Sequence, residues 1–380
     1  MVRHLTSQGH EVTLASLSRS DVETKEAQGI RDYCHKFIIA NIREPMQSLR
    51  MLLRLPTRTP SSMGYFYSSQ LKRQISQELG SNAFDLIFVH CSSVALYVAQ
   101  VRGIPKILDF GDIDSQKWLE YAKFRKWPLS WGFRLEGRKL MAAEKQLARQ
   151  FDLCTCTTRL ERETLDSFQT GVPTDWFPNG VDSEYFSPGT EAMEKDSISF
   201  IGRMDYFPNQ ECVSRFCRSI FPKIRQRKPN AKFVIVGADP SPAIRQLGHL
   251  PGVVVTGSVA DVRPYVRKSN LMVAPLNIAR GTQNKILEAM AMGIPVVCSH
   301  LAAAGVDALP ERDLLAATTD DEFVSQILRI LDSEAERARL CSAGRARMLS
   351  HHSWGASMAR MEGIIAGCID KYREGSVGSE

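Results

Sequence analysis

The stretch ARGTQNKILEAMAMGIPVV, residues 279–297, carries one lysine and one glutamate on a predicted helix built largely from Ala, Met, Ile and Leu. A loop with Gly281 precedes the helix, and the open N–H groups at a helix N-terminus form a ready anion site. Lys285 could meet a phosphate there, and Glu288, on the same face, could bind sugar hydroxyls. The spacing fits a solvated Lys–Glu pair on an exposed helix face equally well.

Three carboxylates crowd the end of a predicted strand in LDFGDIDSQKW: Asp109, Asp112 and Asp114. Clustered carboxylates can bind a metal ion, act as a general base or orient hydroxyl groups. Asp114 directly precedes a helical pattern, so we favour it as the N-cap of that helix over a metal ligand. Asp112 is then the better candidate for contact with a substrate.

Short apolar runs bounded by Gly, Pro and Asp alternate with amphipathic stretches, which predicts parallel sheets with crossover helices. EVTLASL, KFIIANI, DLIFVHC, KILDF and LCTCTT precede the turn-rich segment 178–189, and SISFIG, KFVIVG, VVVTG, LMVAPL and PVVCS follow it. A chain of 380 residues is long enough for two domains. We therefore expect two α/β domains, with ligands bound in a cleft outside the strand ends.

The first half of the chain is basic. Lys and Arg outnumber Asp and Glu by 24 to 19 in residues 1–178, an excess of 5 within the net charge of +6. Segment 43–58 repeats arginine at helical spacing: Arg43, Arg50, Arg54 and Arg58. Three aromatic residues follow at 65–67, and aromatic residues accompany basic ones at 123–134. Each segment alone fits a solvated helix face with buried aromatics; together they raise the hypothesis of an anionic membrane or lipid partner. No recognisable nucleic-acid-binding module is present.

The sequence shows no apolar run long enough to span a bilayer and no apolar core of a secretory signal near its start. Its nine cysteines lack the paired spacing of a zinc site, which favours reduced, mostly buried thiols. We expect a cytoplasmic protein, with peripheral attachment to the inner face of the cytoplasmic membrane as a further hypothesis. We expect no metal ion and no cofactor.

Five segments occur in the order and spacing typical of one family: PNGVDSEYFSP, FIGRMDYFPN, FVIVGADP, VTGSVADVRPY and NKILEAMAMGIPVV. Along nearly its whole length the chain resembles the family 4 retaining glycosyltransferases. LDFGDIDSQKWLEYA and ARGTQNKILEAMAMG resemble the bacterial subgroup associated with exopolysaccharide and exosortase systems.

The resemblance implies the GT-B fold, in which two doubly wound, Rossmann-like α/β domains face a cleft. Residues 1–178 would form the acceptor-binding domain and 190–354 the nucleotide-sugar domain, joined by a linker at 179–189. The helix expected at 355–373 would cross back to the first domain.

The resemblance also assigns the donor site. Gly202 and Arg203 match the family's Gly-Arg pair, whose arginine contacts the donor phosphates. A planar guanidinium can bind two phosphate oxygens and stabilise the departing diphosphate. Glu288 matches the glutamate that holds the ribose, and Val259 matches the loop that meets the base. The expected donor-binding set is Gly202, Arg203, Gly237, Gly257, Val259, Arg280, Gly281, Thr282, Gln283, Asn284, Lys285 and Glu288.

The chain departs from the family pattern at three places. Arg280 stands where a second glutamate is common, and it would contact an acidic sugar, the diphosphate or Glu288. Pro208 stands where a phosphate-binding lysine is frequent, so Lys285 would supply that cation. The sequence opens at a segment that ends the first helix of relatives. The first strand and its Gly-rich loop are therefore expected to be absent from the first domain.

The sequence thus predicts a metal-independent enzyme that transfers a sugar from a UDP or GDP donor with retention at the anomeric carbon. The acceptor would be lipid-linked or a saccharide, in exopolysaccharide or cell-surface polysaccharide synthesis. Arg203 and Lys285 would stabilise the leaving group, while Asp112, beside Asp109 on the acceptor side, would orient a hydroxyl. Two alternatives remain: a nucleotide-sugar 2-epimerase of the same fold, and a catalytically inactive binding protein.

Overall fold

The computed structural model describes residues 1–42 and 44–377, so Arg43 of the predicted basic segment lies outside the described residues. The chain divides into two compact units. Unit 1 comprises Met1–Thr157, Glu161–Phe177 and the chain from Met358 onward; unit 2 comprises Thr158–Leu160 and Pro178–Ser357. The segment 179–189, expected as a linker, is part of unit 2. Helix α17 (Trp354–Val377) contributes its first residues to unit 2 and its remainder to unit 1.

The strands of unit 1 form two separate parallel sheets. Strand β1 (Thr13–Ser18) pairs with β2 (Lys36–Asn41). The second sheet has the order β3-β4-β5-β6, with bounds Ile87–His90, Lys106–Asp109, Leu153–Cys156 and Thr174–Trp176. Every residue of β4 is buried, as expected for a central parallel strand, and the strand ends at Asp109. Asp109 is thereby placed at the carboxyl edge of the sheet, beside the end of β3.

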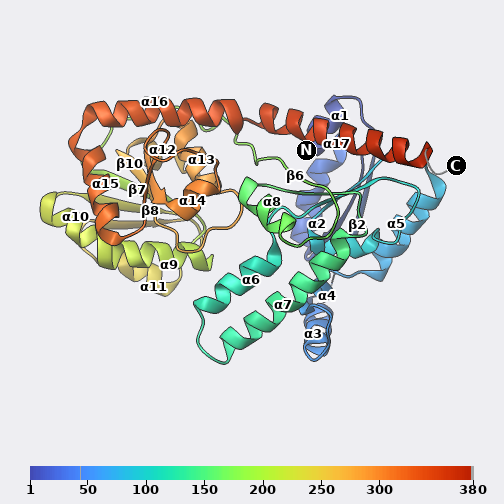
Figure 1. Ribbon diagram of the computed structural model, residues 1–380. Coiled ribbons are helices and arrows are strands. Elements are labelled where there is room, and N and C mark those ends of the chain that lie inside the picture. The colour runs from blue at the N-terminus through green and yellow to red at the C-terminus, as the bar shows by residue number, and fades with distance from the viewer. Residues whose placement is uncertain (43, 378–380) are drawn as a thin grey trace. The chain divides into compact units, whose positions relative to one another are not determined.

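Helices cover the sheets of unit 1 and also extend away from them (Figure 1). Their bounds are α1 Val2–Ser7, α2 Asp21–Ala27, α3 Glu44–Arg54, α4 Ser61–Tyr65, α5 Ser69–Ser81, α6 Asp114–Lys123, α7 Leu129–Ala148 and α8 Arg159–Asp166, with 3-10 turns at Gln28–Tyr33 and Ser92–Tyr97. Helices α6 and α7 pack against each other as a hairpin, and α3 lies beside α4. Helix α17 packs Met361 and Ile365 with Ile107 of β4 in a separate apolar cluster.

Unit 2 contains one six-stranded parallel sheet with the order β12-β11-β10-β7-β8-β9. The bounds are β7 Ser197–Ile201, β8 Lys232–Val236, β9 Val253–Gly257, β10 Leu271–Ala274, β11 Val296–Ser299 and β12 Leu315–Ala317. The chain proceeds from β7 outward to β9 and then returns to β10 on the other side of β7. This reversal creates a topological switch point between β7 and β10, where ligands of such sheets bind.

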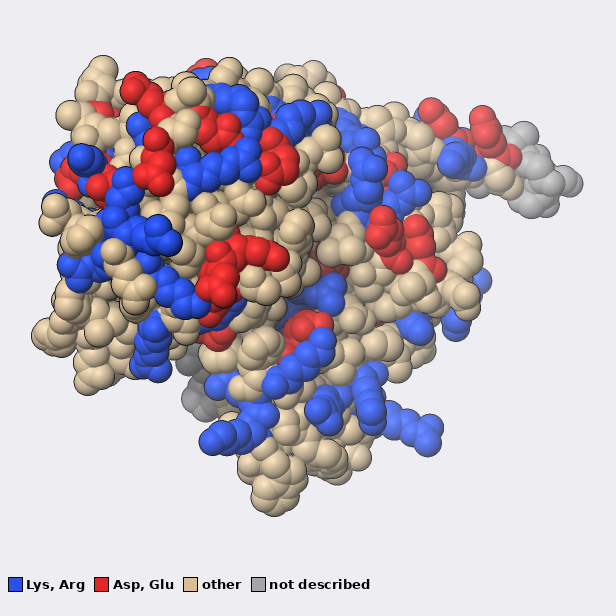
Figure 2. Space-filling view, turned by 60° about the vertical axis from the view of Figure 1, so that its left-hand side comes forward, with Lys and Arg blue, Asp and Glu red and all other residues tan. Residues whose placement is uncertain are grey.

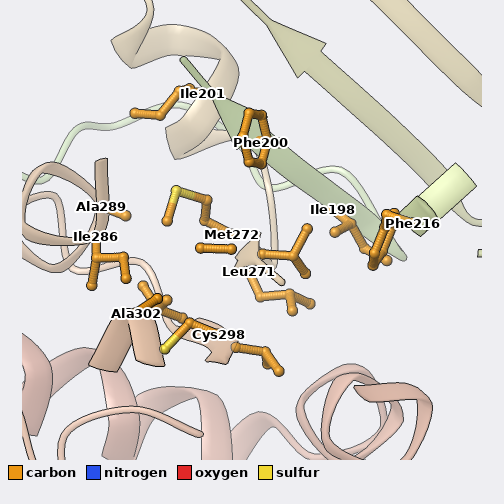
Figure 3. Close-up of a cluster of buried hydrophobic side chains, with 14 of the residues drawn as sticks. Ile198, Phe200, Ile201, Phe216, Leu271, Met272, Ile286, Ala289, Cys298 and Ala302 are labelled. Carbon is orange, nitrogen blue, oxygen red and sulfur yellow. The ribbon is translucent and has the colours of Figure 1, made fainter. Parts of the chain in front are cut away.

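The helices of unit 2 enclose a continuous apolar core. Their bounds are α9 Phe207–Arg215, a π-helical turn Phe216–Ile220, α10 Phe221–Arg227, α11 Pro242–Leu247, α12 Arg263–Arg267, α13 Asn284–Ala291, α14 His300–Ala304, α15 Asp320–Asp332 and α16 Glu334–His351. Figure 3 shows Ile286 and Ala289 of α13 beside Met272 of β10. Both residues are fully buried. Because these residues face the core, Lys285 and Glu288 lie at its margin, where both are half-buried.

All ten apolar runs identified in the sequence contain strands, and two further strands, β6 and β12, were missed. Each missed strand is three residues long. No helix within the described ranges is long and apolar enough to cross a bilayer.

Candidate functional site

The loops that follow β7 and β8 are fixed against each other at the switch point. Gly202 N donates to Val236 O at 3.1 Å, and Met204 N donates to Ala238 O at 2.8 Å. Gly237 approaches this loop so closely that a Cβ on it would lie 1.8 Å from Gly202 O. No side chain larger than hydrogen fits there without moving the backbone. The predicted donor residues Gly202 and Gly237 therefore set the path of the chain around Arg203.

A buried amide links this loop to helix α13. Lys285 Nζ donates to Asn209 Oδ1 at 2.6 Å, and Asn209 Nδ2 donates to the backbone oxygen of Arg203 at 2.8 Å. Asn209 lies on α9 and is only 4% exposed. Asn209 was not predicted from the sequence, in which its position shortly after the Gly-Arg pair is the one indication of a role. The arrangement brings Arg203 and Lys285, two of the predicted catalytic residues, to one end of the same sheet.

Lys285 occupies a partly apolar position. Its ammonium lies 5.0 Å from the centre of the Phe200 ring, and burial lowers the pKa of Lys285 to about 8. Burial likewise raises the pKa of Glu288 above its ordinary value, and the nearby Lys285 charge offsets part of that rise. A solvated Lys–Glu pair on an exposed face is therefore the wrong interpretation of the spacing. The lysine instead bonds the buried amide.

The exposed guanidinium of Arg203 lies beside two carboxylates. Its side chain is 71% exposed, its Nε lies 3.1 Å from Asp205 Oδ1, and its Nη2 lies 2.6 Å from Asp205 Oδ2. Asp239 Oδ2 lies 3.7 Å from Nη2. The hydrogen bonds that Arg203 donates to Asp205 raise the pKa of Arg203 above its usual value. An anion that binds this guanidinium must share it with Asp205 or displace that carboxylate.

The loop before α13 leaves the helix N-terminus without a side-chain cap. Gln283 is the N-cap residue, but its amide donates to Arg280 O at 3.0 Å. Gly281 adopts a left-handed conformation with φ 60°, and Thr282 Oγ1 is buried without a hydrogen-bond partner. Asn284, the first helical residue, is exposed, and Arg280 is half-buried. These features suit an anion bound at the open N–H groups of α13.

The predicted base-binding loop lies farther along the sheet. Gly257 ends β9 with φ 71°, and Val259 packs against the core of unit 2. A hollow runs beside β9, lined by Asp239, Pro240, Arg245, Gly248, His249, the residues of β9 and Ser258. The hollow includes Gly257 but not Arg203, Lys285 or Glu288. Asp239 of this lining also lies 3.7 Å from Arg203 Nη2, so the hollow that contains Gly257 adjoins the exposed guanidinium, while Lys285 and Glu288 belong to α13.

Asp109, predicted to lie on the acceptor side, is 1% exposed and is hydrogen-bonded to a histidine. Its Oδ2 lies 2.7 Å from His90 Nδ1, and its Oδ1 accepts from Thr155 Oγ1 at 3.1 Å and from Gly111 N at 3.3 Å. The hydrogen bond that His90 donates to the Asp109 carboxylate raises the pKa of His90 to about 10, so the imidazole is charged at neutral pH. Asp109 is thus a positioning residue. His90 was missed, although it lies within the run DLIFVHC and is the last residue of β3.

Asp112 is half-buried and accepts from Thr157 Oγ1 at 3.4 Å, while burial raises its pKa. The predicted N-cap at Asp114 is wrong, because Asp114 is the first residue of α6 and Ile113 is its N-cap. Two buried carboxylates from other helices satisfy the N–H groups instead. Glu161 accepts from Ile113 N and Glu144 from Ser115 N, each at 3.1 Å. In residues 1–42 and 44–377, no three His, Cys, Asp or Glu residues form a group that could hold a metal ion.

Two family descriptions match the chain. Residues 1–185 match Glycosyltransferase Family 4, and residues 195–333 match Glycosyl transferases group 1. A curated relative from Corynebacterium glutamicum, a GDP-mannose-dependent monoacylated alpha-(1-6)-phosphatidylinositol monomannoside mannosyltransferase, is 25% identical over 233 residues. That match covers 55% of this chain, and the chain spans 61% of that relative's length.

Solved structures of glycosyltransferases share the fold. A glycosyltransferase from Rickettsia africae has a TM-score of 0.65 at 10% identity, covering 97% of this chain and 93% of that one. Anabaena HepE in complex with UDP has a TM-score of 0.61 at 14% identity, covering 93% and 89%. With the two family matches and the two parallel α/β units, these likenesses identify the architecture. The chain belongs to the family 4-like glycosyltransferases of the GT-B fold.

Proposed function

We propose that this glycosyltransferase takes its sugar from a nucleoside diphosphate donor, UDP or GDP, held in unit 2. The observation that carries the proposal is the bond from Lys285 through Asn209 to the backbone of Arg203 at the switch point. It fixes the backbone of Arg203 relative to Lys285 and the uncapped N-terminus of α13, and two cations beside such a terminus suit a diphosphate. Relatives named for GDP-mannose and solved with UDP support this class of donor.

In the proposed reaction the Arg203 guanidinium binds two diphosphate oxygens and the Lys285 ammonium a third, which stabilises the leaving group. Glu288 accepts hydrogen bonds from the ribose hydroxyls. Transfer proceeds with retention, and the departing phosphate accepts the proton of the attacking hydroxyl. The new glycosidic bond therefore forms as the bond from the anomeric carbon to phosphate breaks, and no strong enzyme base is needed.

In unit 1, His90 and Asp112 are the groups suited to the acceptor. His90 is a charged hydrogen-bond donor because Asp109 holds its pKa near 10, and Asp112 can accept from a hydroxyl. We assign the acceptor to lipid-linked or saccharide intermediates of exopolysaccharide or cell-surface polysaccharide synthesis, used at a membrane surface. The basic bias of residues 1–178 supports an anionic lipid partner.

The test is a calorimetric titration of the full chain with UDP and with GDP, using Arg203→Ala and Lys285→Gln as variants. Each substitution should weaken binding at least tenfold, since it removes one charge-assisted contact. Lys223→Ala is the matched control, because Lys223 of α10 forms an ion pair with Asp321 of α15 and is not one of the predicted donor residues. Equal binding in all variants would overturn the assignment.

Product analysis with the preferred donor then separates the alternatives. Sugar transfer that depends on an added acceptor is expected. Conversion of the nucleotide-sugar without any acceptor would indicate a 2-epimerase. Donor binding without any product across lipid and saccharide acceptors would favour an inactive binding protein.

A further inference from the structure

Helix α3 presents a row of large apolar side chains to solvent. Met46, Leu49, Leu52 and Leu53 are each more than half exposed, from 52% to 66%, and Leu55, directly after the helix, is 50% exposed. A surface helix of a globular protein normally turns its apolar stripe toward the core. An exposed row of this size indicates a surface covered by another apolar phase.

Two polar side chains of α3, Gln47 and Arg50, face the protein instead. Gln47 is 3% exposed, and its amide donates to Tyr67 O at 3.2 Å. Arg50 donates to the same oxygen at 2.9 Å, and its guanidinium lies 5.7 Å from the Tyr67 ring. The inward polar contacts fix the orientation of the helix, so the outward apolar face is a built feature of unit 1. The arginine repeat in segment 43–58 was one reason to expect an anionic membrane or lipid partner, but Arg50 of that repeat contacts Tyr67.

The turn between α6 and α7 adds a second apolar element. Trp127 is 83% exposed, Leu129 60% and Trp131 63%. Lys139 of α7 donates to the backbone oxygens of Arg54 and Leu55, at 3.2 and 2.7 Å, so α7 supports the end of α3. In Figure 1, α3 and the α6–α7 turn both lie at the lower end of unit 1.

The exposed charges around these side chains are predominantly positive, although Glu120 of α6 pairs with Lys123 at 2.8 Å and α3 begins at Glu44. Within segments 46–58 and 123–138, the only acidic residue is Glu136, which is 6% exposed. The exposed charged residues there are Arg58, Lys123, Lys126, Arg134 and Arg138. Figure 2 shows a tan projection at the lower end of the molecule with Lys and Arg side chains above it. A second copy of the same face would bring these positive charges together, whereas anionic headgroups complement them.

We propose that the outward face of α3 and the α6–α7 turn insert into an anionic lipid bilayer. The leucines would enter the boundary of the acyl chains, Trp127 and Trp131 would lie at headgroup level, and the Lys and Arg residues would contact lipid phosphates. The proposal deepens the membrane location within the proposed function by naming the surface that makes contact. Its test requires no catalysis and no donor.

The experiment is co-sedimentation of the full chain with vesicles of phosphatidylcholine, alone or mixed with phosphatidylglycerol. Binding should be selective for the mixed vesicles and should weaken with added salt. The triple variant Leu49→Ser, Leu52→Ser, Leu53→Ser should lose at least tenfold in partitioning, and so should Trp127→Ser with Trp131→Ser. Leu309→Ser, which changes a side chain that is 53% exposed in unit 2, should bind as the unaltered chain does.

Donor titration of the same variants keeps the two proposals apart, since the variants should retain nucleotide affinity and a cooperative unfolding transition. Absence of vesicle binding by the unaltered chain, or equal binding by the leucine and Leu309 variants, would overturn the insertion surface. So would a stable dimer in sedimentation velocity that the leucine substitutions dissociate, because the face would then join two copies. None of these results bears on the donor site.

Discussion

Helices α13 and α3 use one amphipathic pattern in opposite orientations. Helix α13 buries Ile286 and Leu287 completely and leaves Lys285 at the edge of the switch point. Helix α3 exposes Leu53 by 66% and buries Gln47 to 3% exposure. Periodicity identifies a helix and its two faces but does not state which face meets the core. The neighbouring groups decide which face turns inward. The apolar face of α13 packs against the sheet of unit 2, whereas Gln47 and Arg50 of α3 donate hydrogen bonds to the backbone oxygen of Tyr67.

The largest difference between the two helices should appear in stability. Ile286→Ala removes buried atoms from a closely packed core and should lower the free energy of unfolding by about 2–5 kcal/mol. Leu53→Ala removes a side chain that is two-thirds exposed and should change it by less than about 0.5 kcal/mol. Urea unfolding of both variants, followed by circular dichroism, measures the contrast.

Unit 1 and unit 2 can unfold separately, so each variant is compared with the unaltered chain in the transition of its own unit. A loss from Leu53→Ala as large as that from Ile286→Ala would mean that the face of α3 is buried in solution.

The strands were predictable from the sequence because a parallel strand buried on both faces is a continuous apolar run. Strands β6, with sequence TDW, and β12, with sequence LAA, were not, since three residues carry no periodicity. The cap at Asp114 failed for a related reason. The carboxylates that serve the start of α6 come from Glu144 and Glu161, 29 and 48 residues away, and no local pattern announces them.

The second prediction concerns the polar side of α3. Arg50→Met removes a charge-assisted hydrogen bond to Tyr67 O. Gln47 would then remain as the side-chain donor to that oxygen. We expect a loss of about 1.5–2 kcal/mol in the unfolding free energy of unit 1. Denaturant unfolding tests it, with Leu52→Ala as the matched change on the outward face. A gain in stability from Arg50→Met would show that the helix prefers its apolar side inward.

As with the strands, some residues of the candidate site could be named from the sequence and others could not. Arg203, Lys285 and Glu288 could be named as candidates because they stand in motifs with a fixed spacing along the chain, and their roles stay predictions. Asn209 and His90 act through contacts made only in the folded protein, with Lys285 and with Asp109. A residue that positions another has no spacing of its own in the sequence.

The third prediction uses the pKa of Lys285, which burial lowers to about 8 from an ordinary value near 10.4. The ammonium is charged below about pH 8 and neutral above it, so the dissociation constant for UDP should rise about tenfold between about pH 7 and pH 9. Lys285→Arg should abolish that rise, since a guanidinium stays charged. Calorimetric titration across this range tests the prediction, and a flat profile for the unaltered chain would contradict it.

The lowered pKa of Lys285 also predicts how the stability of the unliganded chain depends on pH. Between about pH 8 and pH 10 the unfolded chain binds a proton at Lys285 that the folded chain does not. The contribution of Lys285 to the free energy of unfolding should therefore increase with pH in that window. The difference in unfolding free energy between the unaltered chain and Lys285→Met, followed across this pH range, measures that contribution. Helix α3 contains no lysine, so the same experiment cannot be done on it.

The smallest expected effect tests how the two charges of α13 depend on each other. The Glu288 carboxylate favours the charged form of Lys285, so Glu288→Gln should move the midpoint of the UDP-binding profile below about pH 8 by a few tenths of a unit. Glutamine keeps an oxygen that can accept from ribose, so affinity well below the midpoint should change less than the midpoint does. Asp205→Asn is the comparison, because it changes a carboxylate bonded to Arg203. An unmoved midpoint in Glu288→Gln would mean that the amide of Asn209, and not the glutamate, sets the state of the lysine.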